Sequence, residues 1–290
     1  MTDPDLDRNS PLAGTEVHEL ASEAIGDTFK IFVGHCGDLE ASTPAPVLYV
    51  TDANGFFGTA VDTVRNLQLR AMLPPMLVVG VGYPMGGLID TVAIRVRDLT
   101  PSTDQAFTDE WMGGTPSGGG PAFVRFLADE LQPWVAARYA IDPNDATFFG
   151  HSFGGLLGSH VLLTEPGVFQ RYILGSPSLW WNGNESFTTE AEFAARHDDL
   201  EATVFIGVGE LETHEGRQRE NANMPPEAVA MARARRLDMV DDTERFAAVL
   251  RSRNYPSLRL ESVVLPDEFH VTVGPLHLSR GLRSVFDAPR

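Results

Sequence analysis

Cysteine is almost absent from this 290-residue chain, in which Cys36 is the one thiol. No intrachain disulfide can form, so the composition favours a reducing compartment and we expect the cytoplasm. Long apolar runs are missing too: the longest candidate, residues 76–83, is too short to span a bilayer and fits a buried strand. Residues 1–7 are acidic and lack the basic and apolar regions of a secretory leader, so we expect none.

Lysine is equally scarce, since Lys30 is the one lysine beside 21 arginines. The chain also has 40 acidic residues, which give it a net charge of −18. A surface this anionic repels nucleic acid and anionic membranes, so we expect neither as a partner. The charge favours solubility and is tolerated best where salt screens it. Adaptation to high salt and a coding bias toward arginine explain it equally well.

Strand and helix patterns alternate along most of the chain. This alternation predicts a mainly parallel, doubly wound α/β sheet with helices on both faces, and two antiparallel strands at its start. We expect a loose polar segment over residues 1–14 and a single domain over 15–290. The expected strands cover 16–21, 28–33, 47–51, 76–82, 146–149, 172–174, 203–208 and 258–265, and the expected helices 60–72, 122–139, 156–163, 189–196, 227–253 and 276–285.

One long stretch, residues 84–120, is rich in glycine and proline and has few periodic apolar positions. A connection of this length is typical of a functional or mobile loop. We therefore interpret it as a candidate active-site loop.

The segment Gly150-His-Ser-Phe-Gly-Gly lies between the apolar run 146–149 and the apolar helix pattern 156–163. A Gly-x-Ser-x-Gly segment between a strand and a helix is typical of the nucleophile elbow of α/β-hydrolases. It predicts that Ser152 is held in a strained turn at the end of the sheet. A glycine-rich turn that only packs closely is the alternative.

A serine needs a base to take its proton, and in this fold the acid and then the histidine follow the nucleophile along the chain. His270 comes directly after the last expected strand, where a loop can bring it to Ser152. His277 belongs to the first turn of the terminal helix, and His214 lies too early, beside the acid. We therefore predict His270 as the base.

The acid is expected after the strand that ends near Gly209, where Glu210 and Glu212 both follow. The residue pattern leaves the choice between them open, because the chain has already turned. The developing oxyanion needs two fixed N–H donors. We expect one from Phe153, directly after the nucleophile, and the other from the loop 52–55 after the third strand.

Several motifs along the chain resemble one known family. They are the residues 49–54 (YVTDAN), 79–84 (VGVGYP), 95–101 (RVRDLTP), 126–131 (FLADEL), the elbow, 176–181 (SPSLWW), 268–270 (EFH) and 278–283 (LSRGLR). Together they resemble the putative-esterase (esterase D-like) branch of the α/β-hydrolases. Within it, the chain is most similar to bacterial ferric-siderophore esterases. The resemblance covers almost everything from Glu16 onward.

This resemblance implies Ser152 as nucleophile and His270 as base. It selects Glu212 as the acid, because relatives carry that residue three positions after the glycine, although in siderophore esterases a Ser–His dyad can work without an acid. It also implies the N–H of Asn54 as the second oxyanion donor. A siderophore lactone is anionic, and Arg95, Arg97, Arg217 and Arg219 could supply positive charge for it; pairing with a structural carboxylate such as Asp98 is the alternative. We take Arg97 and Trp180 as candidates for substrate binding.

Relatives pass quickly from the acid loop to the next helix, so the resemblance marks residues 213–238 as an insertion. Part of a lid over the site and a surface that packs on a second subunit are both open interpretations. The oligomeric state, monomer or homo-oligomer, is not predicted.

The expected function is hydrolysis of small or aromatic acyl esters through an acyl-serine intermediate, with no cofactor and no metal. The alternatives are a ferric-siderophore trilactone esterase, an acyltransferase to an alcohol or sugar like the related mycolyltransferases, and a non-catalytic binding scaffold. In each catalytic case the partner is a small-molecule ester.

Overall fold

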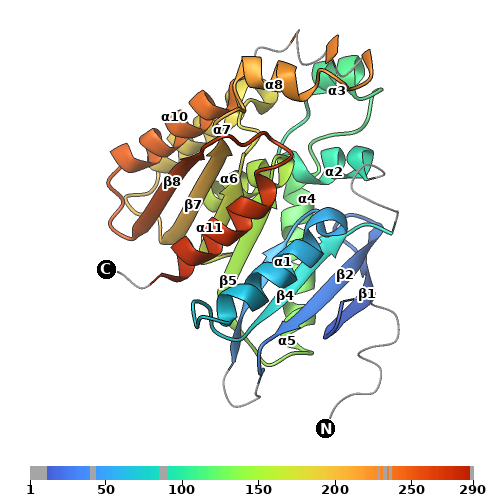
Figure 1. Cartoon of the computed structure of the whole chain (residues 1–290), viewed down its shortest axis with the longest axis vertical. Helices are drawn as coiled ribbons and strands as arrows, with labels where there is room; N and C mark the ends of the chain where they lie inside the picture. Colours follow the sequence, from blue (N-terminus) through green and yellow to red (C-terminus); the bar gives the residue numbers. More distant parts are fainter. Residues whose placement is uncertain are drawn as a thin grey trace.

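Apolar strands of this chain assemble into one eight-stranded sheet in the order β1-β2-β4-β3-β5-β6-β7-β8 (Figure 1). The computed structural model describes residues 12–39, 44–84, 91–226, 229–230, 234 and 237–287. The strands are β1 (Thr15–Ser22), β2 (Asp27–Cys36), β3 (Ala45–Val50), β4 (Met76–Gly82), β5 (Ile141–His151), β6 (Arg171–Gly175), β7 (Ala202–Gly209) and β8 (Leu258–Leu265). Strand β2 is antiparallel to both neighbours, and every pair from β4 to β8 is parallel. The predicted sheet is confirmed.

Helices cover both faces of this sheet, because neighbouring residues of the central strands point to opposite sides. In β4, Val78 packs in the core under α1 and α11, whereas Val79 packs in the larger core on the other face. The helical elements are α1 (Ala53–Gln68), α2 (Val92–Leu99), α3 (Gln105–Trp111), α4 (Gly120–Arg125), the π-helical turn η1 (Phe126–Leu131), α5 (Gln132–Ala136), α6 (Phe153–Thr164), α7 (Trp181–Ala194), α8 (His214–Glu220), α10 (Met239–Ser252) and α11 (Gly274–Phe286).

Helix α1 begins at Ala53, directly after β3, and not near residue 60 as predicted. The turn-forming pair Asn54-Gly55 suggested a loop, but the buried residues Phe57, Val61 and Val64 follow helical spacing from the first turn. The predicted helix 122–139 is interrupted by the π-helical turn η1. Pro133 follows this turn and has no N–H to continue the α-helical hydrogen bonding.

The expectation of little regular structure over 84–120 is wrong, because helices α2 and α3 form there. Asp104 caps α3 by accepting a hydrogen bond from the N–H of Phe107 at 3.0 Å. Residues 85–90 of this stretch lie outside the described residues, as do residues 1–11 of the expected loose segment.

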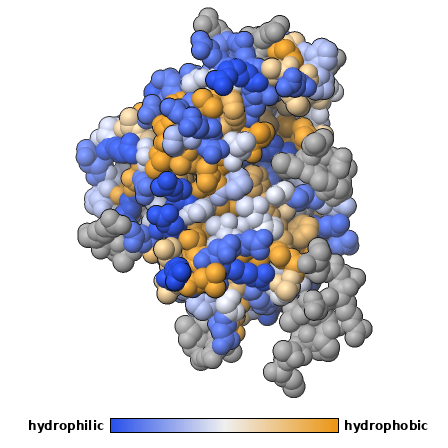
Figure 2. Space-filling view, in the orientation of Figure 1, coloured by the Kyte–Doolittle hydropathy of each residue, from blue (hydrophilic) through white to orange (hydrophobic). Residues whose placement is uncertain are grey.

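Hydrophilic and hydrophobic residues are interspersed on the face that Figure 2 shows. Leu69 and Val271 are the most exposed large apolar side chains of the described residues, at 78% and 75%. Among the helices that the structure describes, none has the length and apolar character needed to cross a bilayer.

Candidate active site

The chain turns sharply between β5 and α6, and Ser152 occupies the turn with φ 61° and ψ −116°. A serine rarely adopts a positive φ, so the turn is strained. Two glycines make it possible: a Cβ on Gly150 would lie 2.2 Å from the carbonyl oxygen of Gly154, and one on Gly154 would lie 2.5 Å from Oγ1 of Thr51. This is the strand–turn–helix geometry that the Gly-x-Ser-x-Gly pattern predicts.

Glu212 and His270 meet although 58 positions separate them in the chain. Oε2 of Glu212 lies 2.6 Å from Nδ1 of His270, and the Glu212 side chain is fully buried. Burial opposes ionisation of Glu212. The hydrogen bonds from His270, Ser176 and the N–H of Gly209 outweigh it, so the pKa of Glu212 is lowered from its usual value. Its neighbour Glu210 instead accepts a hydrogen bond from the N–H of Asp267.

Ser152 and His270 line the same cavity, which has a volume of about 140 Å³. Aromatic side chains form much of its wall, and both long segments that the sequence marks out contribute to it. The other lining residues are Phe107, Met112, Phe153, Ser178, Trp180, Arg217, Asn221, Leu237 and Met239. The structure therefore brings Trp180 to the cavity together with the nucleophile and base candidates.

A match to a known family covers most of the chain: the family described as Putative esterase matches residues 22–247. The chain belongs to this esterase family. The esterase is 32% identical to the ferri-bacillibactin esterase BesA of Bacillus subtilis, over 94% of this chain and 89% of the relative. It is 31% identical to the siderophore enterobactin esterase of Emericella nidulans, with 82% of this chain and 81% of that protein covered.

A solved structure, the BES protein from Bacillus cereus, has a TM-score of 0.79 and 28% identity to the esterase. The similarity covers 96% of this chain and 97% of that one. The α/β-hydrolase fold and the resemblance seen in the motifs are thereby confirmed, and the chain is an esterase by family.

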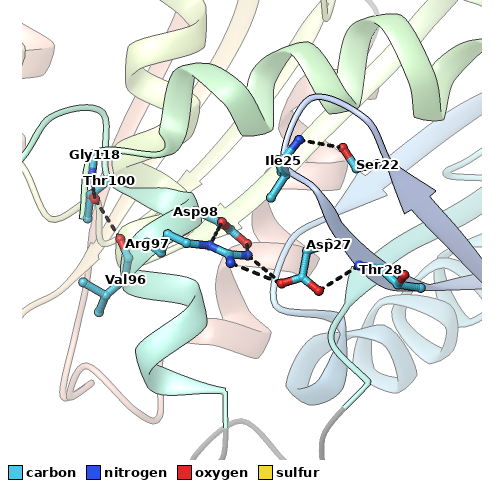
Figure 3. A network of polar contacts seen from close by, with 9 residues as sticks. All are labelled: Ser22, Ile25, Asp27, Thr28, Val96, Arg97, Asp98, Thr100 and Gly118. Carbon is cyan, nitrogen blue, oxygen red and sulfur yellow. Dashed lines mark hydrogen bonds and ion pairs between the residues drawn. The ribbon is translucent and has the colours of Figure 1, made fainter. Parts of the chain in front are cut away.

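Arg97, a candidate for substrate binding, is not among the described residues that line the cavity of the esterase. Its guanidinium forms ion pairs with Asp98 at 2.6 Å and Asp27 at 3.1 Å, as Figure 3 shows. These contacts fasten α2 to the start of β2. The structure therefore gives Arg97 a place in the scaffold of the esterase.

The two oxyanion candidates lie at the starts of helices. Phe153 is the first residue of α6 and lines the cavity, whereas Asn54 is the second residue of α1 and is not among the described lining residues. The side-chain amide of Asn54 bonds both backbone polar groups of Tyr83, at 2.8 and 3.1 Å. This pairing fastens the first turn of α1 to the end of β4.

Asp52 and Arg95 form a buried ion pair that the residue patterns did not predict. Both guanidinium contacts are short, 2.7 and 2.8 Å, and the two side chains are 1% and 12% exposed. Asp52 directly precedes α1, in the N-cap position but with its carboxylate on Arg95, and Arg95 of α2 lies over the Phe153 ring at 5.4 Å. The pair therefore braces both segments that carry an oxyanion candidate.

Two serines of the segment 176–181 also reach the site without having been predicted there. Ser176 donates a hydrogen bond of 2.5 Å to Oε1 of Glu212, and Oγ of Ser178 lies 3.4 Å from Oγ of Ser152. One short motif thus contacts both the acid and the nucleophile candidate. Its presence among the family motifs was the signal that could have identified them.

Arg217 on α8 brings positive charge to the cavity. Its guanidinium contacts the sulfur of Met239 at 3.3 Å, and no carboxylate pairs with it among the described residues. No group of three or more histidine, cysteine, aspartate or glutamate side chains is arranged to hold a metal ion within the described ranges.

Proposed function

We propose that this esterase cleaves carboxylic esters through an acyl-serine intermediate, with Ser152 as nucleophile, His270 as general base and Glu212 as the acid. The observation that carries the proposal is the 2.6 Å contact between Glu212 and Nδ1 of His270, at a cavity that His270 shares with Ser152. A carboxylate at Nδ1 holds the ring so that Nε2 is free to take a proton, and it stabilises the imidazolium that forms.

In the first step, Nε2 of His270 takes the Ser152 proton while Oγ bonds to the ester carbon. Backbone N–H groups of Phe153 and Asn54 stabilise the oxyanion. The bond to the alcohol oxygen then breaks, and His270 gives its proton to that oxygen. A water molecule next loses a proton to His270 and attacks the acyl carbon. The carboxylic acid leaves as Ser152 regains its proton.

For the substrate we propose a siderophore ester. BesA and the enterobactin esterase, both named for such substrates, match this chain over most of their lengths. A ferric siderophore is strongly anionic and the protein carries a net charge of −18, so the substrate needs local positive charge at the site. Arg217, at the cavity and without a carboxylate partner among the described residues, can provide it.

A small or aromatic acyl ester is the second candidate, because the cavity measures only about 140 Å³ and has Phe107, Phe153 and Trp180 in its wall. A site of that volume is smaller than the range of about 300–1,000 Å³ typical of drug-sized ligands. It accepts one short acyl arm, while the rest of a larger substrate remains outside.

The test is a comparison of ferric enterobactin with p-nitrophenyl acetate, butyrate and benzoate, using wild type and Ser152→Ala. We expect the trilactone to be cleaved with the highest kcat/KM and the variant to lose at least about 10³-fold in turnover. If only the short esters are cleaved, the siderophore ester is rejected as the substrate and the small or aromatic acyl ester is favoured. An added alcohol that receives the acyl group in preference to water would instead identify a transferase. Absence of fluorophosphonate labelling at Ser152 would reject the acyl-serine route.

A further inference from the structure

His151 lies directly before the nucleophile candidate and packs against the loop that carries His270. It is the last residue of β5 and only 8% exposed. Its Nε2 lies 3.0 Å from the backbone carbonyl oxygen of His270, and the two imidazole rings lie 4.6 Å apart at 32°. The side chain therefore contacts both the backbone and the ring of His270.

The room for this contact comes from a glycine on the neighbouring strand. A Cβ on Gly175 would lie 3.2 Å from Nδ1 of His151 and 2.5 Å from Nδ1 of His277. The His277 ring lies 5.6 Å from that of His151 at 37°, so the His151 ring contacts two other imidazoles, both tilted against it. The Phe56 ring of α1 also packs against His151, with the two ring centres 5.6 Å apart.

The hydrogen bond determines which nitrogen of His151 carries the proton. A carbonyl oxygen only accepts, so Nε2 of His151 donates. In a neutral ring Nδ1 is then a bare acceptor, and it has no hydrogen-bond partner among the described residues. A protonated ring would bury a second N–H without an acceptor, which is costly. The geometry thus fits a neutral His151.

Burial and the neighbouring charges also favour the neutral form of His151. Burial lowers the pKa of His151 well below its usual range, and positive charge on His270 and Arg95 lowers it further. Burial also lowers the pKa of His277 to about 4, although Glu212 opposes that shift. His151 therefore stays neutral at neutral pH, and it does not repel His270 when His270 becomes protonated.

We propose that His151 is a positioning residue for His270, holding its backbone through the Nε2–H···O=C bond while Glu212 holds its ring. This proposal rests on the proposed function of His270 as the base. The loop has other hydrogen bonds, among them Leu211 N–H to the Glu268 carbonyl at 3.0 Å and Val271 N–H to Glu220 at 3.0 Å. Within the described residues, however, His151 is the one group that bonds the His270 carbonyl. Small displacements of a catalytic group reduce turnover by up to about 10²-fold.

The test compares His151→Leu, which removes the donor, with His151→Gln, which keeps a side-chain N–H of similar reach. We expect His151→Leu to lower kcat about 10- to 100-fold with KM changed by less than about threefold, and His151→Gln to recover most of it. Fluorophosphonate labelling of Ser152 should slow in parallel. His160→Leu is the matched control, since His160 lies on α6 and lines a different surface cavity.

A second measurement observes the hydrogen bond of His270 directly, by NMR. The low-field proton resonance of the His270–Glu212 hydrogen bond should persist in His151→Gln and broaden or disappear in His151→Leu. If the leucine variant does not fold, His151→Asn, which keeps an amide of shorter reach, takes its place. A folded leucine variant with wild-type kcat, or a glutamine variant as impaired as leucine, would overturn the proposal. Failure of the wild type to cleave any ester would reject the proposed function instead.

Discussion

Glu212 is held in place by two hydrogen bonds on one oxygen while its other oxygen contacts His270. Oε1 accepts from Ser176 at 2.5 Å and from the N–H of Gly209 at 2.8 Å, and Oε2 lies 2.6 Å from Nδ1 of His270. Because every one of these contacts favours the carboxylate, the arrangement presents a negative charge of fixed position to the imidazole.

Replacing Glu212 by Gln should therefore impair catalysis far more than replacing Glu210. The amide can donate to Nδ1 and favour the wrong tautomer of His270, so we expect kcat to fall about 10²- to 10⁴-fold. Glu210→Gln is the matched control and should stay within about twofold. The measurement is kcat on p-nitrophenyl butyrate for both variants. Equal activity of the two would remove Glu212 from the catalytic group and favour a Ser152–His270 dyad.

Glu16 lies in β1, at the edge of the sheet away from β8, and should make the free energy of unfolding depend on pH. Hydrogen bonding from His35, helped by Tyr139 and His18, lowers the pKa of Glu16 to about 2 despite partial burial. A depressed pKa adds stability above the unfolded value of 4.5, which is lost as pH falls toward 2. Glu16→Gln should thus be less stable than wild type at pH 6, and the difference should shrink between pH 5 and pH 2. Urea unfolding at each pH measures it, and a constant difference would contradict the cause.

The strands of the sheet were predictable because their signal is local. The expected ranges 76–82 and 258–265 coincide with β4 and β8. Residues 76–82 are a continuous apolar run, residues 258–265 begin with apolar and polar residues in alternation, and turn residues bound both ranges. The onset of α1 was missed because a helix that starts directly on a strand end needs no polar loop, and the burial of Phe57 overrides the turn preference of Asn54-Gly55.

The candidate site was predictable only where chain order carries information. The order Ser, acid, His selected Ser152 and His270 as candidates, which the structure places at one cavity, but residue patterns could not separate Glu212 from Glu210. The contact that distinguishes them joins residues 58 positions apart. The Asp52–Arg95 pair and the contact of Ser176 with Glu212 were not predicted for the same reason, because the two partners of each contact lie 43 and 36 positions apart in the chain.

The positive charge of Arg217 should make the esterase prefer an anionic ester over a neutral one of similar structure, and two matched esters test this. Mono-p-nitrophenyl glutarate and p-nitrophenyl butyrate share a leaving group and differ in a terminal carboxylate. Arg217→Gln should lower kcat/KM for the anionic ester about 10-fold and leave the neutral ester nearly unchanged, since a guanidinium–carboxylate contact is lost only with the former. Arg219→Gln is the control, because Arg219 contacts the Phe269 ring and does not line the cavity. An unchanged ratio of the two esters in Arg217→Gln would exclude this role.

Breaking the Asp52–Arg95 pair should destabilise the whole fold, because the pair is buried between α1 and α2. Removing one partner leaves the other charge without compensation, so we expect Asp52→Asn or Arg95→Met to cost about 3–5 kcal/mol of unfolding free energy. The double variant should cost less than the sum of the two, since it leaves no uncompensated charge. Urea denaturation of the four proteins completes the double-mutant cycle. Additive losses would mean that the two side chains stabilise the protein independently and that the ion pair itself contributes nothing.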